Sequence, residues 1–137
     1  MTDTVSESTR SHIMSRVRRR DTGPELLLRR ALWAIGARGW RVDDRRLPGR
    51  PDLAFTRLRV AVFVDGAFWH GHPRKFTLGK SGSYWDVKIA RNVRRDREVN
   101  DRLTVMGWHV VRLWDFDVQA APEEAARRVL REIARAG

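Results

Sequence analysis

The chain has 137 residues, of which 42% are hydrophobic, and this is enough to form one folded domain with its own core. It contains no cysteine, which excludes disulfides, thiol chemistry and every cysteine-based zinc site. The formal net charge of +11 points to a polyanionic partner, usually nucleic acid.

The N-terminal part of the chain is polar and then basic. We expect residues 1–20 to form a mobile basic arm that contacts DNA, and residues 21–137 to form a single domain. Thr22 is the expected N-cap of the first helix, with Pro24 in its first turn. Helical spacing of apolar residues continues to Ile35, after which glycines end the helix.

Strands and helices then alternate along the chain. A continuous apolar run over 60–64 predicts a strand buried on both faces. A long loop over 65–82 separates it from a long helix. The elements that we expect are strands over 40–42, 52–55, 60–64 and 108–113, a helix over 84–106 and a final helix from 122 through 133. This order predicts an α/β fold, a central mixed β-sheet flanked by helices.

Two aspartates stand at the open ends of neighbouring predicted strands. Asp52 begins one strand and Asp65 ends the next, and a tight turn between the strands brings the two carboxylates together. Two carboxylate oxygens with water ligands make an adequate magnesium site, and magnesium can polarise a phosphodiester. Both aspartates also fit ordinary turn positions, so the spacing leaves the two interpretations open.

Asp96 is the anomaly of the long helix. Ile89, Asp96 and Leu103 are seven residues apart and share one face, so Asp96 interrupts an apolar stripe. A buried carboxylate needs a partner. That partner is either an arginine of the sheet or a histidine that Asp96 orients.

The loop before this helix carries two large aromatic residues, Phe68 and Trp69, beside His70. They either pack together as a satellite cluster or stack on and wedge between bases. The arginines around Asp96 are similarly open to two interpretations, a solvated face or a phosphate-binding face.

Several motifs occur together in one order: LPGRPD at 47–52, FWH at 68–70 and RNV followed by RDR within 91–97. In this combination, over about residues 9–116, the chain resembles the very short patch repair endonucleases, the Vsr-type branch of the PD-(D/E)xK nuclease superfamily. The resemblance implies a restriction-endonuclease-like fold. It also implies a magnesium-dependent enzyme that nicks duplex DNA 5′ to the thymine of a T:G mismatch, in very short patch repair of deaminated 5-methylcytosine.

The resemblance further implies three groups of site residues. The catalytic residues that it implies are Asp52, His70, Asp96 and Glu25, with His70 acting on the attacking water and Asp96 as its partner. The metal ligands are Asp52, Asp65 and Val64, the last through its backbone carbonyl. The DNA-binding residues are expected to be Phe68, Trp69, Trp85, Met14, Arg16, Arg91 and Arg95.

One departure from the family concerns zinc. Family members often hold a structural zinc with cysteines and a histidine. Here the cysteine positions appear as Ala67, a residue near Arg74 and a residue near Phe116, and only His72 remains. We therefore expect no structural zinc, and a loop held by packing.

Three functions compete. The first is mismatch-directed nicking, with mismatched duplex DNA and repair proteins as partners. The second is a Vsr-like nuclease of a restriction or defence system that cuts other modified or foreign DNA. The third, an inert DNA-binding module, is disfavoured by the retained residues Asp52, Asp65, His70 and Asp96. We expect a bacterial, cytoplasmic, nucleoid-associated monomer without membrane contact, because no apolar run is long enough to span a bilayer.

Overall fold

A computed structural model describes residues 23–136 of the chain. The basic arm expected over 1–20, with Met14 and Arg16, and the expected N-cap Thr22 lie outside the described residues. The elements are α2 (Gly23–Ala34), β1 (Trp40–Val42), β2 (Leu53–Phe55), β3 (Val60–Asp65), α3 (Ser83–Val105), β4 (His109–Trp114), α4 (Asp115–Ala120) and α5 (Pro122–Ala136).

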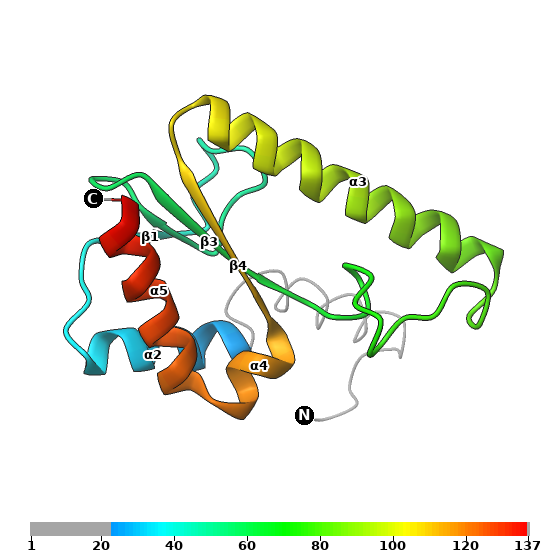
Figure 1. Ribbon diagram of the computed structural model, residues 1–137, viewed down its shortest axis with the longest axis horizontal. Helices are drawn as coiled ribbons and strands as arrows, with labels where there is room; N and C mark the ends of the chain where they lie inside the picture. Colours follow the sequence, from blue (N-terminus) through cyan, green and yellow to red (C-terminus); the bar gives the residue numbers. More distant parts are fainter. Residues whose placement is uncertain (1–22, 137) are drawn as a thin grey trace, which may run out of the picture.

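The four strands form one sheet in the order β1-β2-β3-β4. β2 pairs antiparallel with β1 and β3, whereas β4 runs parallel to β3 because α3 carries the chain back across the sheet. The parallel register places Val62 beside Val111 and Asp65 beside Trp114. The predicted mixed sheet flanked by helices is confirmed (Figure 1).

The two faces of the sheet are covered differently. On one face Val60 and Val62 pack with Leu28 and Leu32 of α2 and with residues of α4 and α5. On the other face Ala61 and Phe63 pack with Val99 and Leu103 of α3. This alternation along β3 is the period of two that a strand buried on both faces requires. Each fully buried Leu or Val side chain contributes about 1.5–3 kcal/mol relative to an exposed one.

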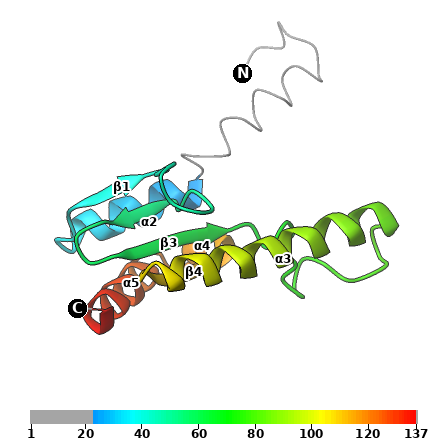
Figure 2. The same cartoon turned by 90° about the horizontal axis from the view of Figure 1, so that it is seen from above.

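Helix α3 is longer than the sheet that it covers. Figures 1 and 2 show it extending past the strands, with the loop over 66–82 beside its N-terminal half. The contacts of α3 with strands are therefore concentrated in its C-terminal half, where Val99 and Leu103 are buried. The N-terminal half of α3 lies beside the loop over 66–82 instead of the strands. The candidate site lies where the loop, α3 and the end of β3 meet.

The short helix α4 was not predicted. It has six residues, directly follows β4 and buries Val118. Six residues are too few to give a readable helical period, so its sequence reads as a connection. Among residues 23–136, no helix is both long and apolar enough to cross a membrane.

Candidate active site

A pocket of about 810 Å³ opens where the end of β3, the loop after it, α2 and α3 meet. Most of the residues predicted as catalytic, metal-binding or DNA-binding line this one pocket. They are Glu25, Asp52, Val64, Asp65, Trp69, His70, Arg95 and Asp96. Three other predicted DNA-binding residues, Phe68, Trp85 and Arg91, lie outside its walls.

Asp52 lines the pocket and lies just before β2. Its Oδ2 accepts a hydrogen bond of 2.6 Å from the backbone N–H of Val64 on β3. In a strand the N–H and C=O of one residue point to the same side, so the carbonyl of Val64 also faces the side of Asp52. The carboxylate of Asp52 and the carbonyl of Val64, which the family resemblance implies as metal ligands, therefore face the same side.

Glu25, in the first turn of α2, adds a second carboxyl group beside Asp52. Burial, followed by the charge and hydrogen bond of Glu25, raises the pKa of Asp52 to about 8. Glu25 itself is only 7% exposed. Two buried carboxyl groups in contact are costly as a pair of anions, and a bound cation relieves that cost. Carboxylate and carbonyl oxygens are the donors that hard divalent cations prefer, so the residues present fit a magnesium ion.

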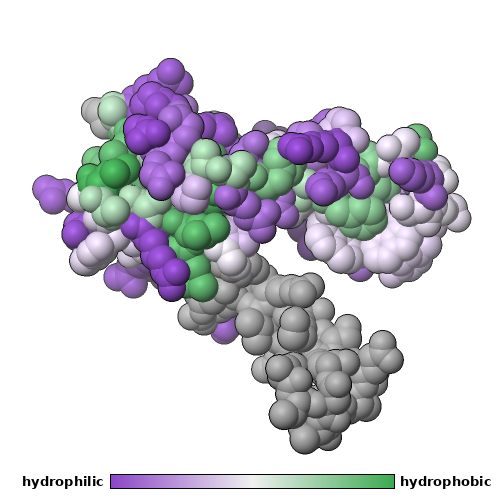
Figure 3. Space-filling view, turned by 90° about the horizontal axis from the view of Figure 1, so that it is seen from below, coloured by the Kyte–Doolittle hydropathy of each residue, from purple (hydrophilic) through white to green (hydrophobic). Residues whose placement is uncertain are grey.

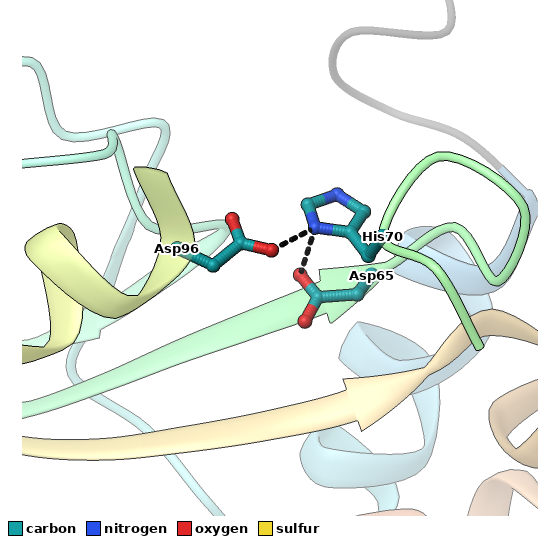
Figure 4. A group of neighbouring side chains, drawn as sticks. All are labelled: Asp65, His70 and Asp96. Carbon is teal, nitrogen blue, oxygen red and sulfur yellow. Dashed lines mark hydrogen bonds and ion pairs between the residues drawn. The ribbon is translucent and has the colours of Figure 1, made fainter. Parts of the chain in front are cut away.

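A second cluster lies at the end of β3. Nδ1 of His70 lies 2.5 Å from Oδ2 of Asp96 and 3.8 Å from Oδ1 of Asp65 (Figure 4). One ligand atom from each of these three residues lies within 4.8 Å of the others, so the cluster could also hold a metal ion. Asp65 comes from β3, His70 from the loop and Asp96 from α3, so the cluster exists only in the folded chain.

The groups around His70 change its pKa in opposite directions. Burial opposes the charge on His70, but the hydrogen bond to Asp96 and the negative charges of Asp65 and Asp96 outweigh it and raise the pKa of His70. Burial also raises the pKa of Asp65, against the lowering effects of Arg112 and His70. Asp96 contacts both of the partners that the sequence left open, since it lies against His70 and also 3.7 Å from Nη1 of the sheet residue Arg112.

Arg112 lines the pocket and was not predicted from the sequence. It lies on β4 beside Phe63 of β3, and its Nη1 lies 3.0 and 3.2 Å from the two carboxylate oxygens of Asp65. A signal was present, because Arg112 is the only charged residue in the apolar run from Val110 to Trp114. A charge in a buried strand requires a partner, as Asp96 did.

The aromatic residues gather at the end of the molecule formed by the loop and the start of α3. The ring centroids of Phe68, Trp69 and Trp85 lie 5.3–5.6 Å apart in edge-to-face contacts. Trp69 is nevertheless 47% exposed, and Tyr84 beside Trp85 is 67% exposed. In Figure 3 this end carries weakly polar residues bordered by hydrophilic ones. The rings therefore pack on one another and still present faces to solvent; Tyr84 was not predicted.

The predicted phosphate-binding residues Arg91 and Arg95 are exposed on α3. Neither makes an ion pair with another residue of the described part of the chain, whereas the arginines 127, 131 and 135 of α5 pair with glutamates. The positive charge of α3 is thus available to a ligand beside the pocket.

The loop positions that would carry zinc ligands in the family form a packed cluster instead. The ring of His72 lies edge-on to Trp114 at 4.6 Å and to Phe116 at 5.0 Å. The guanidinium of Arg74 lies 4.6 Å from the centre of the Phe116 ring. Ala67 is buried, and its N–H donates to Asp115 Oδ1 at 3.3 Å. These contacts supply the predicted packing; the zinc content itself stays a prediction.

Comparison with known proteins gives this site a class. Residues 2–75 match the family model described as DNA mismatch endonuclease Vsr. The chain is 43% identical to the type II nicking enzyme V.HpaIIP of Haemophilus parainfluenzae, over 82% of this chain and 81% of that protein. It is 43% identical to the type II nicking enzyme V.NmeDIP of Neisseria meningitidis serogroup C, over 85% and 80% of the two chains. It is 38% identical to the DNA mismatch endonuclease Vsr of Escherichia coli, over 84% and 74%.

The fold and these relatives define a nicking endonuclease with a restriction-endonuclease-like sheet. The chain belongs to the Vsr family of DNA endonucleases. The resemblance inferred from the sequence motifs is thereby confirmed at the level of the family.

Proposed function

We propose that the protein nicks one strand of duplex DNA 5′ to the thymine of a T:G mismatch, in very short patch repair of deaminated 5-methylcytosine, with magnesium as cofactor. The observation that carries this proposal is the pocket itself. It unites Asp52, His70 and Asp96 with the half-exposed ring of Trp69. Groups suited to phosphodiester hydrolysis thus lie beside a group suited to reading a disturbed base stack.

The proposed metal ligands are Asp52 and the carbonyl of Val64, with Glu25 as the acid beside them. A magnesium ion held there would polarise the scissile phosphate and stabilise the leaving oxygen. Asp65 is the remaining candidate ligand. Whether it joins the others depends on Arg112, because the guanidinium already lies against both of its oxygens.

His70 is the proposed general base. Its Nδ1 is engaged by Asp96, so Nε2 is the nitrogen left to accept a proton from the attacking water. Asp96 holds the ring in place and stabilises the charge that the ring gains. In this arrangement only Nε2 of His70 gains a proton from the attacking water.

Phe68, Trp69 and Trp85 are the proposed wedge beside the mismatched pair, and Arg91 and Arg95 the proposed phosphate contacts. Unstacking bases costs a few kcal/mol per step, and it costs least where pairing is already weak. An exposed aromatic cluster therefore binds a mismatch with less penalty than a paired site. The proposed complex is a monomer on duplex DNA at the bacterial nucleoid, with repair proteins acting on the nick.

A second candidate is nicking within a restriction system. The relatives in Haemophilus and Neisseria are named type II nicking enzymes, whereas the relative in Escherichia coli is named a DNA mismatch endonuclease. The site is compatible with both roles, since both require strand nicking.

A nicking assay tests the proposal. Matched duplexes, T:G duplexes in several sequence contexts and duplexes with the other mismatches are incubated with magnesium or with a chelator. We expect nicks 5′ to the thymine of T:G, only with magnesium. Equal nicking of matched and T:G duplexes would reject mismatch recognition, and nicking of matched foreign DNA alone would favour the restriction role.

A further inference from the structure

The guanidinium of Arg112 makes several polar contacts within the site, unlike a solvated surface arginine. Its Nε donates to Asn100 Oδ1 at 2.8 Å, and its Nη1 donates to both oxygens of Asp65. Its guanidinium also lies 4.1 Å from the centre of the Phe63 ring. The side chain is 20% exposed, so these contacts are largely screened from water.

These contacts fix the guanidinium between two elements. Asn100 and Asp96 belong to α3, and Asp65 ends β3. A planar guanidinium with several donors is suited to such a position, because its geometry is rigid and its charge is permanent. Arg112 therefore supplies a fixed positive charge in the cluster of Asp65, His70 and Asp96.

The same three residues are the cluster that could hold a metal ion. A divalent cation there would have to approach within about 4 Å of an arginine that already neutralises Asp65, at a strong repulsive cost. At the other end of the pocket the carboxyl of Asp52 is in contact with the carboxyl of Glu25, and burial together with this contact raises the pKa of Asp52. The two acidic clusters thus differ, since one contains a guanidinium against Asp65 and the other contains two carboxyl groups in contact.

We propose that Arg112 is a positioning residue that takes the place of a cation in the Asp65–His70–Asp96 cluster, keeps Asp65 out of the metal's coordination and confines the divalent ion to the Asp52 side. This inference rests on the proposed metal-dependent nuclease function. It assigns Asp65 a different role from the one expected from the sequence, as the anchor of Arg112 beneath His70.

The test counts bound Mn²⁺ in the protein without DNA. The signal of free Mn²⁺ in electron paramagnetic resonance is measured during titration, so the count does not depend on nicking. We expect one ion per chain in the natural protein. We expect Asp52→Asn to weaken binding by at least about tenfold, and Asp65→Asn to change it by less than about threefold.

Removing the arginine should open the second cluster. Arg112→Met is expected to bind a second Mn²⁺, Arg112→Lys to bind one because the charge is kept, and Arg112→Met with Asp65→Asn to return to one. Circular dichroism and thermal unfolding check that each variant is folded. A merely structural ion pair would alter stability without altering the number of ions.

Two results would overturn the inference. The first is an Asp65→Asn variant that loses Mn²⁺ as strongly as Asp52→Asn, which would make Asp65 a ligand; this near-isosteric variant decides the question even if Arg112→Met does not fold. The second is a folded Arg112→Met variant that still binds one ion. If the numbers of bound Mn²⁺ ions are as expected but the protein does not nick T:G duplexes, only the proposed function is rejected. If the protein nicks T:G duplexes but the numbers of bound Mn²⁺ ions differ from those expected, only the role of Arg112 is rejected.

Discussion

Nδ1 of His70 and Oδ2 of Asp96 lie 2.5 Å apart, although 26 residues of chain separate them. The contact joins the loop after β3 to the middle of α3, where Asp96 interrupts the apolar stripe. It gives the partly buried carboxylate of Asp96 a partner, and it leaves the other ring nitrogen of His70 available. The same contact thus serves the packing of α3 and the chemistry of the pocket.

If the pair acts as a unit, its two members should not contribute independently to the rate. We expect His70→Ala and Asp96→Asn each to lose much of a general-base contribution of about 10²–10⁴ in rate. The double variant should lose little more than either single variant. Single-turnover nicking of a T:G duplex at saturating enzyme measures the cycle. Fully additive losses would leave Asp96 as a structural partner of Arg112.

The buried carboxyl of Asp52 gives a second prediction. Asp52→Asn keeps the shape and the contact with Val64 but removes the charge that would hold a metal. We expect nicking to fall by at least about tenfold, because metal stabilisation of the transition state is worth several kcal/mol. DNA binding, measured by fluorescence anisotropy, should remain close to that of the natural protein. A variant that nicks at more than about a tenth of the natural rate contradicts the assignment.

Trp69 offers a test of mismatch reading with a matched control. Trp69→Ala should reduce the preference for T:G over T:A duplexes, because a wedge has less to unstack at a mismatch. Trp33 is also an exposed tryptophan, 58% exposed, but it lies on α2 and does not line the pocket. Trp33→Ala should leave the preference unchanged. If Trp69→Ala weakens binding to T:G and T:A duplexes equally, Trp69 makes a general DNA contact and does not discriminate between them.

The loop without cysteine ligands should be insensitive to chelators. We expect elemental analysis of protein purified without a tag to find no zinc, and thermal unfolding to be unchanged by chelator. Phe116→Ala should instead lower the free energy of unfolding by roughly 1–3 kcal/mol, since it removes a half-buried ring and its contacts with His72 and Arg74. One zinc per chain that survives dialysis contradicts this prediction.

Asp44 predicts a pH dependence of stability. Its hydrogen bond to Arg46 outweighs the effect of burial and lowers its pKa from 3.8 to about 2. A folded-state pKa below the unfolded value means that the carboxylate stabilises the fold above about pH 4, and that this contribution is lost as the pH falls towards 2. Asp44→Asn should therefore be less stable at pH 6 by about 1 kcal/mol, because the exposed Arg46 limits the gain. Urea unfolding at pH 6 and pH 2.5 checks this, and an equal difference at both values would contradict it.

The local pattern of residues along the chain was enough to predict several elements and the family of this protein. The apolar run at 60–64 predicted β3, the helical spacing around Ile89 and Leu103 predicted α3, and the motifs at 47–52 and 68–70 indicated the family. These features are readable because the residues that define them are close along the chain. The sequence also showed that Asp96 needed a partner, but it left histidine and arginine as equal choices.

The tertiary structure shows that Asp96 contacts both His70 and Arg112. Asp65 and Arg112 are 47 residues apart, and their contact depends on the parallel register of β3 and β4, which places Arg112 beside Phe63. The contact of His70 with Asp96 depends on where α3 crosses the end of the sheet. Pairings of this kind follow from the register of strands and the packing of a helix on them, and neither is encoded in the spacing of neighbouring residues.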